Sequence, residues 1–454
     1  MNPCRQRTTF RLPIPCGALR APLLALLFAA GLILGQSPGG VALAVAPMSP
    51  MSPMASAGAE QIGKSAPAKA ASPIALAGDQ SRLAAPPRAR KPVDGILFRG
   101  RPEAVAQAKT EMRGWLTMLK CPPQIIQLID TPAGDEVGFT LNTPPSDTDT
   151  LTLAERLKWA MPVESVTFQD RHDVALSRAV VSAAEVLAAM MQHGRTFLFS
   201  GDRCSVECLR EHVAIRRNIV YWGSRAEWGF PDPFIPRFNT DLWSALQDGE
   251  WTLKPGVSAR RAIADAFASR PAYELGCKSA CQFIMAHGVL DYFARLRPNA
   301  AMLARLESRV DPVHPLTEIE AKADKQGVIR RPGRLADRQF HVPWNNWVPG
   351  DWGWIKNTDD SSSNEVCAEG ANVIYGGGGT FVNYYADGPL RTLDQSLKRV
   401  YGWRFGVENP DLEIPAALMQ QLRGDPRDGG LLRDVRDVPP FFDALPKAMP
   451  PQAS

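Results

Sequence analysis

The hydrophobic residues of this chain follow two spacings, and these spacings predict most of its helices and strands. Apolar positions three and four residues apart predict helices over residues 103–119, 151–159, 174–193, 206–215, 259–268, 275–296 and 390–401. Short apolar or alternating runs predict strands over residues 125–129, 137–141, 218–222, 352–355, 372–375 and 380–385. This mixture predicts an α+β fold, in which an antiparallel sheet packs against the helix 275–296.

The two ends of the chain lack these spacings. Residues 47–92 are rich in Pro, Ala, Ser and Met, which is typical of a disordered linker. Residues 409–454 form a charged, Pro-rich tail. Between them we expect a helix and hairpin region over residues 93–175 and a larger domain over residues 176–408.

Residues 1–46 have the pattern of an export signal or N-terminal anchor. Arg5, Arg7 and Arg11 precede an apolar run over residues 21–34, and small residues at 41–46 offer a cleavage zone. The run is short for a membrane-spanning helix, and an uncleaved anchor is the alternative. We therefore expect an exported protein, periplasmic or secreted, that contacts a membrane only through this segment.

The charge of the chain excludes one class of function. Its net charge is +4 over 454 residues, and 22% of the residues are charged with both signs mixed. Nucleic-acid binding needs a much stronger positive surface. We expect neither a nucleic-acid partner nor a bound cofactor.

Cys277 is the first candidate for chemistry. It falls in the first turn of the predicted helix 275–296, where unpaired backbone N–H groups favour a thiolate and can hold an oxyanion. Lys278 adds positive charge beside it, whereas Cys281 points into the core one turn later. The competing interpretation is a disulfide or an inert core cysteine.

Two segments after this helix are the candidate walls of a cleft. Trp352 and Trp354 alternate along one predicted strand and therefore share a face. Residues 369–384 predict a hairpin with a Gly-rich turn, which lacks the Gly-Lys-Ser/Thr ending of a phosphate loop. Glu369 stands at its entry, where a buried carboxylate can act as base or orienter and an exposed one belongs to an ordinary turn.

The histidines and the other cysteines point to no catalytic triad. His287 follows Cys277 by ten residues, which places it about 80° away around the helix. His341 leads into the Trp-rich segment and is the better candidate to reach Cys277. Cys204, Cys208 and His212 have a spacing of four residues, but a zinc site is less favoured than a disulfide because a fourth ligand is lacking.

In their order and spacing these segments resemble the spore-coat transglutaminases of bacilli. These are protein-glutamine gamma-glutamyltransferases with a compact, NlpC-type, papain-related fold. The similarity runs over residues 178–401 and includes residues 272–277, Gly350-Asp351 and Asn372-Val373-Ile374. It implies that a protein glutamine acylates Cys277 with loss of ammonia. A lysine amine then forms an isopeptide crosslink, and no metal is implied.

The residues around the nucleophile differ from the pattern of that family. Gly276 replaces a Glu immediately before Cys277, and Glu274 lies two positions earlier. Ala371 replaces a second Glu, so Glu369 is the candidate for the displaced carboxylate, on the same strand face if the strand extends that far. We therefore expect Cys277, Glu369 and Glu274 to be the catalytic residues.

The substrate-binding residues follow from the same comparison. A histidine of the family falls near Asn383 or Tyr384 in this chain. The residues expected to contact substrate are Trp352, Trp354, Asn383 and Tyr384.

Two other functions are compatible with the same sequence. If water replaces the amine, the protein is a thiol amidase or peptidase that acts on cell-wall peptide. If Cys277 is tied in a disulfide, the protein is a binding protein without activity on the same fold.

Overall fold

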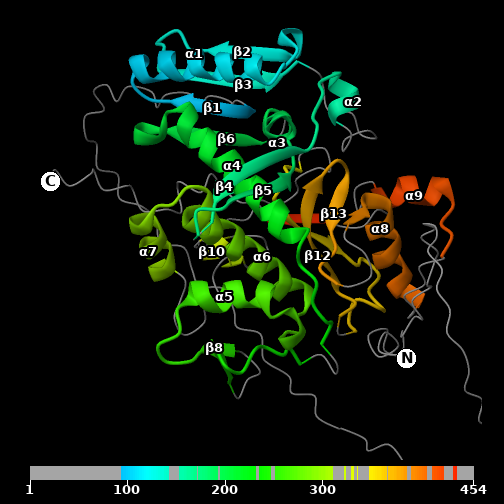
Figure 1. Cartoon of the computed structure of the whole chain (residues 1–454). Coiled ribbons are helices and arrows are strands. Elements are labelled where there is room, and N and C mark those ends of the chain that lie inside the picture. The colour runs from blue at the N-terminus through cyan, green and yellow to red at the C-terminus, as the bar shows by residue number, and fades with distance from the viewer. Residues whose placement is uncertain are drawn as a thin grey trace, which may run out of the picture. The chain divides into compact units, whose positions relative to one another are not determined.

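The structure is a computed structural model. It describes residues 94–142, 153–170, 172–192, 195–231, 235–246, 251–309, 322–323, 329–331, 335, 347–365, 367–385, 390–405, 412–423 and 433–436. All of them fall in one compact unit of the chain (Figure 1). The predicted export signal, the predicted linker and most of the predicted tail lie outside the described residues, as do His193, His314 and His341.

A first sheet is built mainly from the N-terminal part of the unit. Its strand order is β2-β3-β1-β6, with β1 and β6 parallel and the other neighbours antiparallel. Apolar residues of this sheet and of helices α1, α3 and α4 form one core. The elements are β1 (Gly95–Arg99), α1 (Pro102–Met118), β2 (Ile126–Asp130), β3 (Glu136–Leu141), α3 (Ala183–Met190), β6 (Thr196–Ser200) and α4 (Val206–Gly223).

A second, antiparallel sheet carries one wall of the site. Its order is β14-β13-β12-β11-β15, and its apolar residues enter two different cores. Trp352 and Ile374 pack into the core around α6, whereas Val373 and Tyr375 pack into the core beneath α8. The elements are α6 (Cys277–Asp291), β11 (Trp352–Lys356), β12 (Gly370–Gly377), β13 (Thr380–Val382), β14 (Leu390–Thr392), α8 (Leu393–Gly402) and β15 (Arg433–Arg436).

Helices α4 and α6 pack closely in the middle of the unit. A Cβ atom added to Gly288 of α6 would lie 2.6 Å from a side-chain carbon of Ile219 and 2.8 Å from its Cα, so only glycine fits there. Asn218 on α4 donates its amide N–H to the Gly288 carbonyl oxygen over 2.7 Å. Position 288 therefore sets the distance between the helix of Cys277 and its neighbour.

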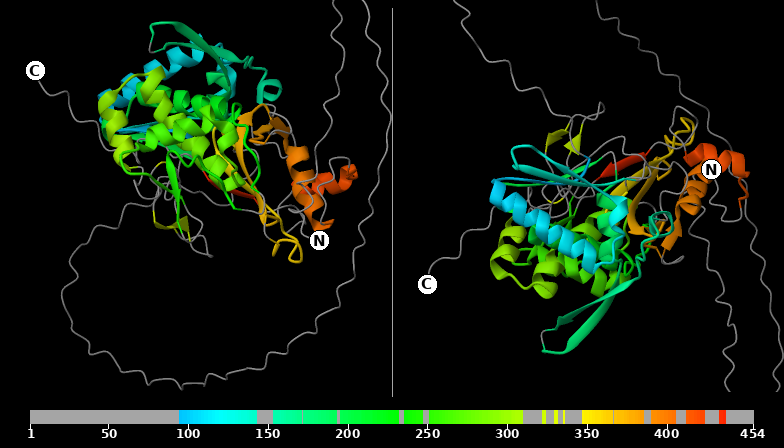
Figure 2. Two further views of the ribbon diagram at one scale, coloured as in Figure 1. Left: turned by 60° about the horizontal axis from the view of Figure 1, so that its bottom comes forward. Right: turned by 90° about the horizontal axis from the view of Figure 1, so that it is seen from above.

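A hairpin of β4 (Glu164–Gln169) and β5 (Ala175–Val180) extends away from these layers (Figure 2). Buried Arg178 fixes it, because its guanidinium forms a 2.5 Å ion pair with Asp291 at the end of α6. The other elements are α2 (Leu153–Leu157), β7 (Trp243–Ala245), β8 (Trp251–Leu253), α5 (Ala259–Ala268), α7 (Ala300–Arg309), β9 (Lys322–Ala323), β10 (Ile329–Arg331), α9 (Ala416–Arg423), the π-helical turn Tyr292–Leu296 and 3₁₀ turns at Pro123–Ile125, Gly201–Arg203, Arg270–Ala272 and Trp403–Phe405.

A buried ion cluster joins the two sheets. The Asp351 carboxylate, at the start of β11, accepts hydrogen bonds from Arg195 (2.6 Å) before β6 and from Arg216 (2.7 Å) on α4. It also accepts the backbone N–H of Val348 at 2.9 Å. Asp351 and Arg216 are completely buried, and the Arg195 side chain is 2% exposed. Two positive charges and one negative charge thus lie away from water and are stabilised by each other.

The predicted α+β class, the Cys277 helix and the predicted hairpins are confirmed. Helix α5 has the predicted bounds, and β2–β3 and β12–β13 pair as antiparallel neighbours. Trp352 and Trp354 pair with Ile374 and Asn372 across β11–β12, so they share a face as expected. The boundary predicted at 175/176 falls inside the β4–β5 hairpin, and β6 shares a sheet with β1–β3.

Three predicted elements are wrong in type or length. Residues 174–193 form β5 and then α3, because the Ser182 side chain caps the second element by accepting the Glu185 N–H. Residues 218–222 continue α4 instead of forming a strand, since Asn218 and Ile219 pack on α6. Residues 390–392 are β14, and α8 begins at Leu393, after the N-cap Thr392, which forms a capping box with Gln395.

Asp351→Asn should destabilise the protein strongly. It removes the charge that compensates two buried guanidinium groups, and breaking a buried ion pair costs about 3–5 kcal/mol. The free energy of unfolding in urea measures the loss. As a control, Glu307→Gln breaks the exposed pair with Arg260 and should cost less than about 1 kcal/mol. Equal losses in the two variants would contradict the role given to the cluster.

Candidate active site

Cys277 is the first residue of α6, and the helix begins without a side-chain cap. Gly276 occupies the N-cap position and has no side chain that could accept a hydrogen bond. Helices α4, α5 and α8 are instead capped by Ser205, Ser258 and Thr392. The first N–H groups of a helix have no partner within it and carry partial positive charge. At α6 no capping side chain competes with a substrate for these groups.

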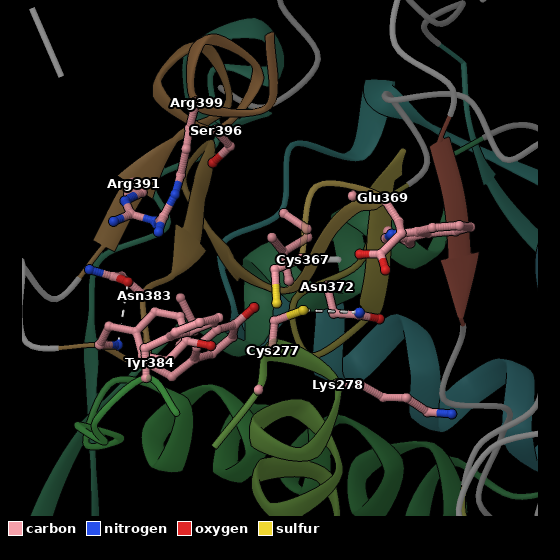
Figure 3. Close-up of a pocket in the computed structure, with 18 of the residues that line it drawn as sticks. Cys277, Lys278, Cys367, Glu369, Asn372, Asn383, Tyr384, Arg391, Ser396 and Arg399 are labelled. Atoms are coloured by element: carbon pink, nitrogen blue, oxygen red, sulfur yellow. Dashed lines mark hydrogen bonds between the residues drawn. The ribbon is translucent and has the colours of Figure 1, made fainter. Parts of the chain in front are cut away.

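Cys277 is half-buried at the bottom of a pocket of about 430 Å³ (Figure 3). The walls come from the start of α6, from β11 and β12, from the end of β13 and from α8. These elements lie far apart in the sequence and meet here because β12 packs on α6 while α8 packs on the same sheet. The pocket is therefore a product of the second sheet and not of any single motif.

Asn372 of β12 is the direct partner of the sulfur. Its Nδ2 lies 3.3 Å from Cys277 Sγ, and its Oδ1 accepts the indole N–H of Trp352 over 3.0 Å. An indole can only donate, so Oδ1 must face Trp352 and the amide N–H must face the sulfur. The amide is thus oriented as a donor, and a donor stabilises sulfur as the thiolate.

Glu369 lines this pocket. Its side chain is exposed, whereas its interpretation as a base or orienter assumed a buried carboxylate. Strand β12 begins at Gly370, so Glu369 lies just before the strand and its side chain is exposed. Its backbone carbonyl accepts the N–H of Asn357, which fixes the chain at the pocket edge. Figure 3 shows the Glu369 carboxylate turned into the pocket.

Glu274 lies elsewhere and is engaged by another residue. Its carboxylate forms a 2.7 Å ion pair with Arg237, and the backbones of these residues exchange two hydrogen bonds. It is not part of the wall around Cys277. The prediction that Glu274 is catalytic is therefore not supported by its position, because its role is to hold the loop that precedes α6.

The four residues predicted to contact substrate divide into two groups. Trp354, Asn383 and Tyr384 line the pocket, as expected. Trp352 is completely buried behind it and cannot touch a substrate. Its contribution is indirect, since its indole orients the Asn372 amide.

Apart from Cys367, which lines the pocket, the other described cysteines and the described histidines lie outside its walls. Cys281 is completely buried in the core. His287 is stacked on Phe267 at 4.5 Å, and burial lowers its pKa to about 3. Of the three histidines described, His172, His212 and His287, none lines the pocket. The proposed partner His341 lies outside the described residues.

The zinc interpretation of Cys204, Cys208 and His212 is wrong in its geometry. Cys204 precedes α4, so it does not share a helix face with the other two. The His212 Nε2 atom accepts a 2.8 Å hydrogen bond from Arg216. Within the described residues no three His, Cys, Asp or Glu side chains are placed to hold a metal ion. The alternative disulfide is not formed either, since all six described cysteines are thiols.

Sequence reasoning missed the residues that complete the pocket. Asn372 was part of the Asn-Val-Ile segment but was not considered as a partner of the sulfur. The alternation of side chains along a strand could have indicated it, because Asn372 pairs with Trp354 and lies on the same face of the sheet. Cys367, Arg391 and Arg399 also line the pocket, and they come from a loop, from β14 and from α8, whose packing the sequence does not show.

A half-buried thiol at an uncapped helix start, with an oriented amide donor in a pocket, defines a thiol acyltransferase or hydrolase site. The model of the protein-glutamine gamma-glutamyltransferase family matches residues 165–400, which is more than half of the 454 residues. The chain belongs to this family, and it is accordingly a cysteine-dependent acyltransferase that acts on protein glutamine.

The comparisons with individual proteins add little. A transglutaminase from Geobacillus stearothermophilus, without its C-terminal extension, is 19% identical over 53% of this chain and 99% of that chain, with a TM-score of 0.33. So low a score supports no argument about this fold. No curated protein matches the chain. The assignment therefore depends on the family model.

Asn372→Ala should slow the reaction of Cys277 with iodoacetamide at pH 7 by about tenfold. It removes a hydrogen bond to a sulfur that reacts as an anion, and such bonds contribute about 1.5–3 kcal/mol. Trp352→Phe keeps the Asn372 amide but removes the indole N–H that orients it, so this substitution should slow the reaction less. Mass spectrometry of the Cys277 peptide measures the rate.

The control for this series is Asn364→Ala, which truncates an exposed asparagine in the loop between β11 and β12. It should react as fast as the wild type. If Asn372→Ala also reacts as fast as the wild type, the amide does not activate the sulfur.

Proposed function

We propose that this pocket performs the transamidation of its family through Cys277. The sulfur attacks the γ-carboxamide carbon of a protein glutamine, and ammonia leaves while a thioester forms. The ε-amine of a lysine then attacks the thioester carbon and releases the sulfur. The product is a glutamyl-lysine isopeptide crosslink between two protein segments.

The observation that carries this proposal is the contact between Asn372 Nδ2 and Cys277 Sγ at the start of α6. A donor and a helix N-terminus act on the same sulfur, and both favour the thiolate. Acyl transfer also needs the reacting atoms to be held away from bulk water. The half-buried Trp354 and the buried Asn383 and Tyr384 form apolar and polar walls for this purpose.

Glu369 is the carboxylate that supports the proton transfers in this proposal. It lines the pocket from the edge of β12, and none of the described histidines does so. In the first step it takes the thiol proton and passes it to the leaving ammonia. In the second step it takes a proton from the attacking amine and returns it to the sulfur.

Cys277→Ala should abolish the incorporation of a fluorescent amine into a glutamine-containing protein. Glu369→Gln should lower the rate by about 100-fold, since general acid–base catalysis contributes roughly 10²–10⁴-fold. The readout is the fluorescence of the protein band after electrophoresis.

Cys281→Ala is the matched control, because it removes the other thiol of the same helix from the core. It should still incorporate the amine. If the wild type releases ammonia without incorporating any amine, water is the acceptor and the protein is an amidase.

We also propose that the protein acts outside the cytoplasm, in the periplasm or after secretion. The support is the sequence of residues 1–46, with arginines before a short apolar run and small residues after it. Among the described residues no helix is both long and apolar enough to cross a membrane. Membrane contact is proposed only through the N-terminal segment.

A fusion of residues 1–46 to alkaline phosphatase should give phosphatase activity in whole bacterial cells. The reporter forms its disulfides, and so becomes active, only in an oxidising compartment. The same reporter without these residues is the control and should remain inactive. Equal low activity of both fusions would show that the segment does not direct export.

A further inference from the structure

Tyr384 is a buried residue of the pocket whose phenol lies near both thiols of α6. Its side chain is 4% exposed and belongs to the core around α6, yet it lines the same pocket as Cys277 (Figure 3). Its phenol interacts electrostatically with Cys281 and with Cys277. Burying a hydroxyl costs free energy unless it makes a hydrogen bond, and a group bound in the pocket can supply such a bond to a residue that lines it.

Backbone hydrogen bonds fix Tyr384 relative to Cys277. The N–H of Trp228 donates to the Tyr384 carbonyl over 2.8 Å, and the next residue, Gly229, accepts the N–H of Leu275 over 2.9 Å. The Tyr385 hydroxyl donates to the Leu275 carbonyl over 3.1 Å. The same short segment is therefore bonded to the tyrosine and to the residue two positions before the nucleophile. Such a frame holds a group in place without reorganisation during a reaction.

The phenol keeps its proton and can therefore donate a hydrogen bond. Burial raises the pKa of Tyr384 well above its ordinary value, and the neighbouring thiols of Cys281 and Cys277 raise it further. The hydroxyl therefore keeps its proton at every working pH and cannot serve as a base. Its surroundings are apolar, where a hydrogen bond to an anion is stronger than in water.

We propose that the Tyr384 hydroxyl donates a hydrogen bond to the oxyanion of the tetrahedral intermediates formed on Cys277. This inference rests on the proposed function, and it makes Tyr384 a catalytic residue of that site. The N–H groups at the start of α6 approach the same oxygen from the side of the helix. The phenol would complete the oxyanion site from the side of the sheet.

The chemistry balances without a proton from Tyr384. Attack forms the bond between sulfur and carbon, and one carbonyl electron pair moves to the oxygen. Collapse reforms the carbonyl and breaks the bond to nitrogen. The departing ammonia takes the proton that Glu369 received from the thiol. Tyr384 stabilises the negative oxygen in between and keeps its own hydrogen atom.

Two reactions of the same sulfur separate this function from a structural one. Acylation by 4-nitrophenyl acetate passes through an oxyanion, whereas alkylation by iodoacetamide does not. We expect Tyr384→Phe to acylate about 100-fold more slowly than the wild type, since loss of one oxyanion donor lowers rates by roughly 10²–10³-fold. Its alkylation rate at Cys277 and its unfolding midpoint in urea should be unchanged.

The matched control is Tyr401→Phe, which removes a phenol on α8 that does not line the pocket. It should leave both rates unchanged, and the rate of Cys277→Ala is subtracted throughout. If Tyr384→Phe loses both reactions equally, the tyrosine only positions Cys277, and if it loses neither, the oxyanion function is wrong.

The ester assay also keeps this inference apart from the proposed function. A wild type that is acylated by the ester but transfers no glutamine would contradict the transamidation. The ratio of the acylation rates of the wild type and Tyr384→Phe could still be measured. A wild type whose Cys277 reacts with neither the ester nor glutamine would overturn both proposals.

Discussion

The buried carboxylate of Asp351 is the interaction on which the arrangement of the site depends. It compensates two guanidinium groups that come from α4 and from the chain before β6, and it fixes the start of β11. The next residue is Trp352, whose indole holds the Asn372 amide, and that amide contacts the sulfur of Cys277. A single line of contacts thus runs from the ion cluster to the nucleophile.

The donors assigned to the sulfur and to the oxyanion are groups without a full charge. Asn372, the helix N-terminus and the phenol of Tyr384 are all donors that keep their hydrogen atoms near neutral pH. A site of this kind stabilises negative charge by oriented dipoles in a low-dielectric pocket. Glu369, the carboxylate proposed to move protons, lies at the exposed edge of the pocket. The residues that orient donors toward the sulfur are therefore different from the residue proposed to transfer protons. For this reason no single sequence motif contains the whole site.

The sequence predicted the parts of the fold that local chemistry controls. The helix with Cys277 in its first turn, the β12–β13 hairpin and the shared face of Trp352 and Trp354 follow from helical spacing, from the Gly-rich turn and from the period of a strand. It failed at residues 218–222, where a β-branched, aromatic run reads as a strand. There the contacts of Asn218 and Ile219 with α6 outweigh the local preference. The strand propensity of these residues is a smaller effect than such packing.

The sequence could indicate a candidate site residue when that residue lies close to Cys277 along the chain or in a segment with a known family pattern. Cys277 was selected from its helix position together with the resemblance of the segments that follow it, whereas Asn372 was missed because its contact with the sulfur depends on an indole twenty residues away along the chain. Glu274 was selected for its proximity in sequence, and the structure places its carboxylate against Arg237, outside the pocket wall. Contacts across a sheet, unlike those within a helix turn, are not visible in residue spacing.

The most direct test of the account is the mass of the enzyme after reaction with a glutamine peptide in the absence of any amine. Acid quenching followed by mass spectrometry of the Cys277 peptide would show whether an acyl group is attached to the sulfur. The account predicts a gain equal to the peptide minus ammonia, located on Cys277 and lost on adding hydroxylamine. An unmodified Cys277, or the same adduct on another cysteine, would contradict it.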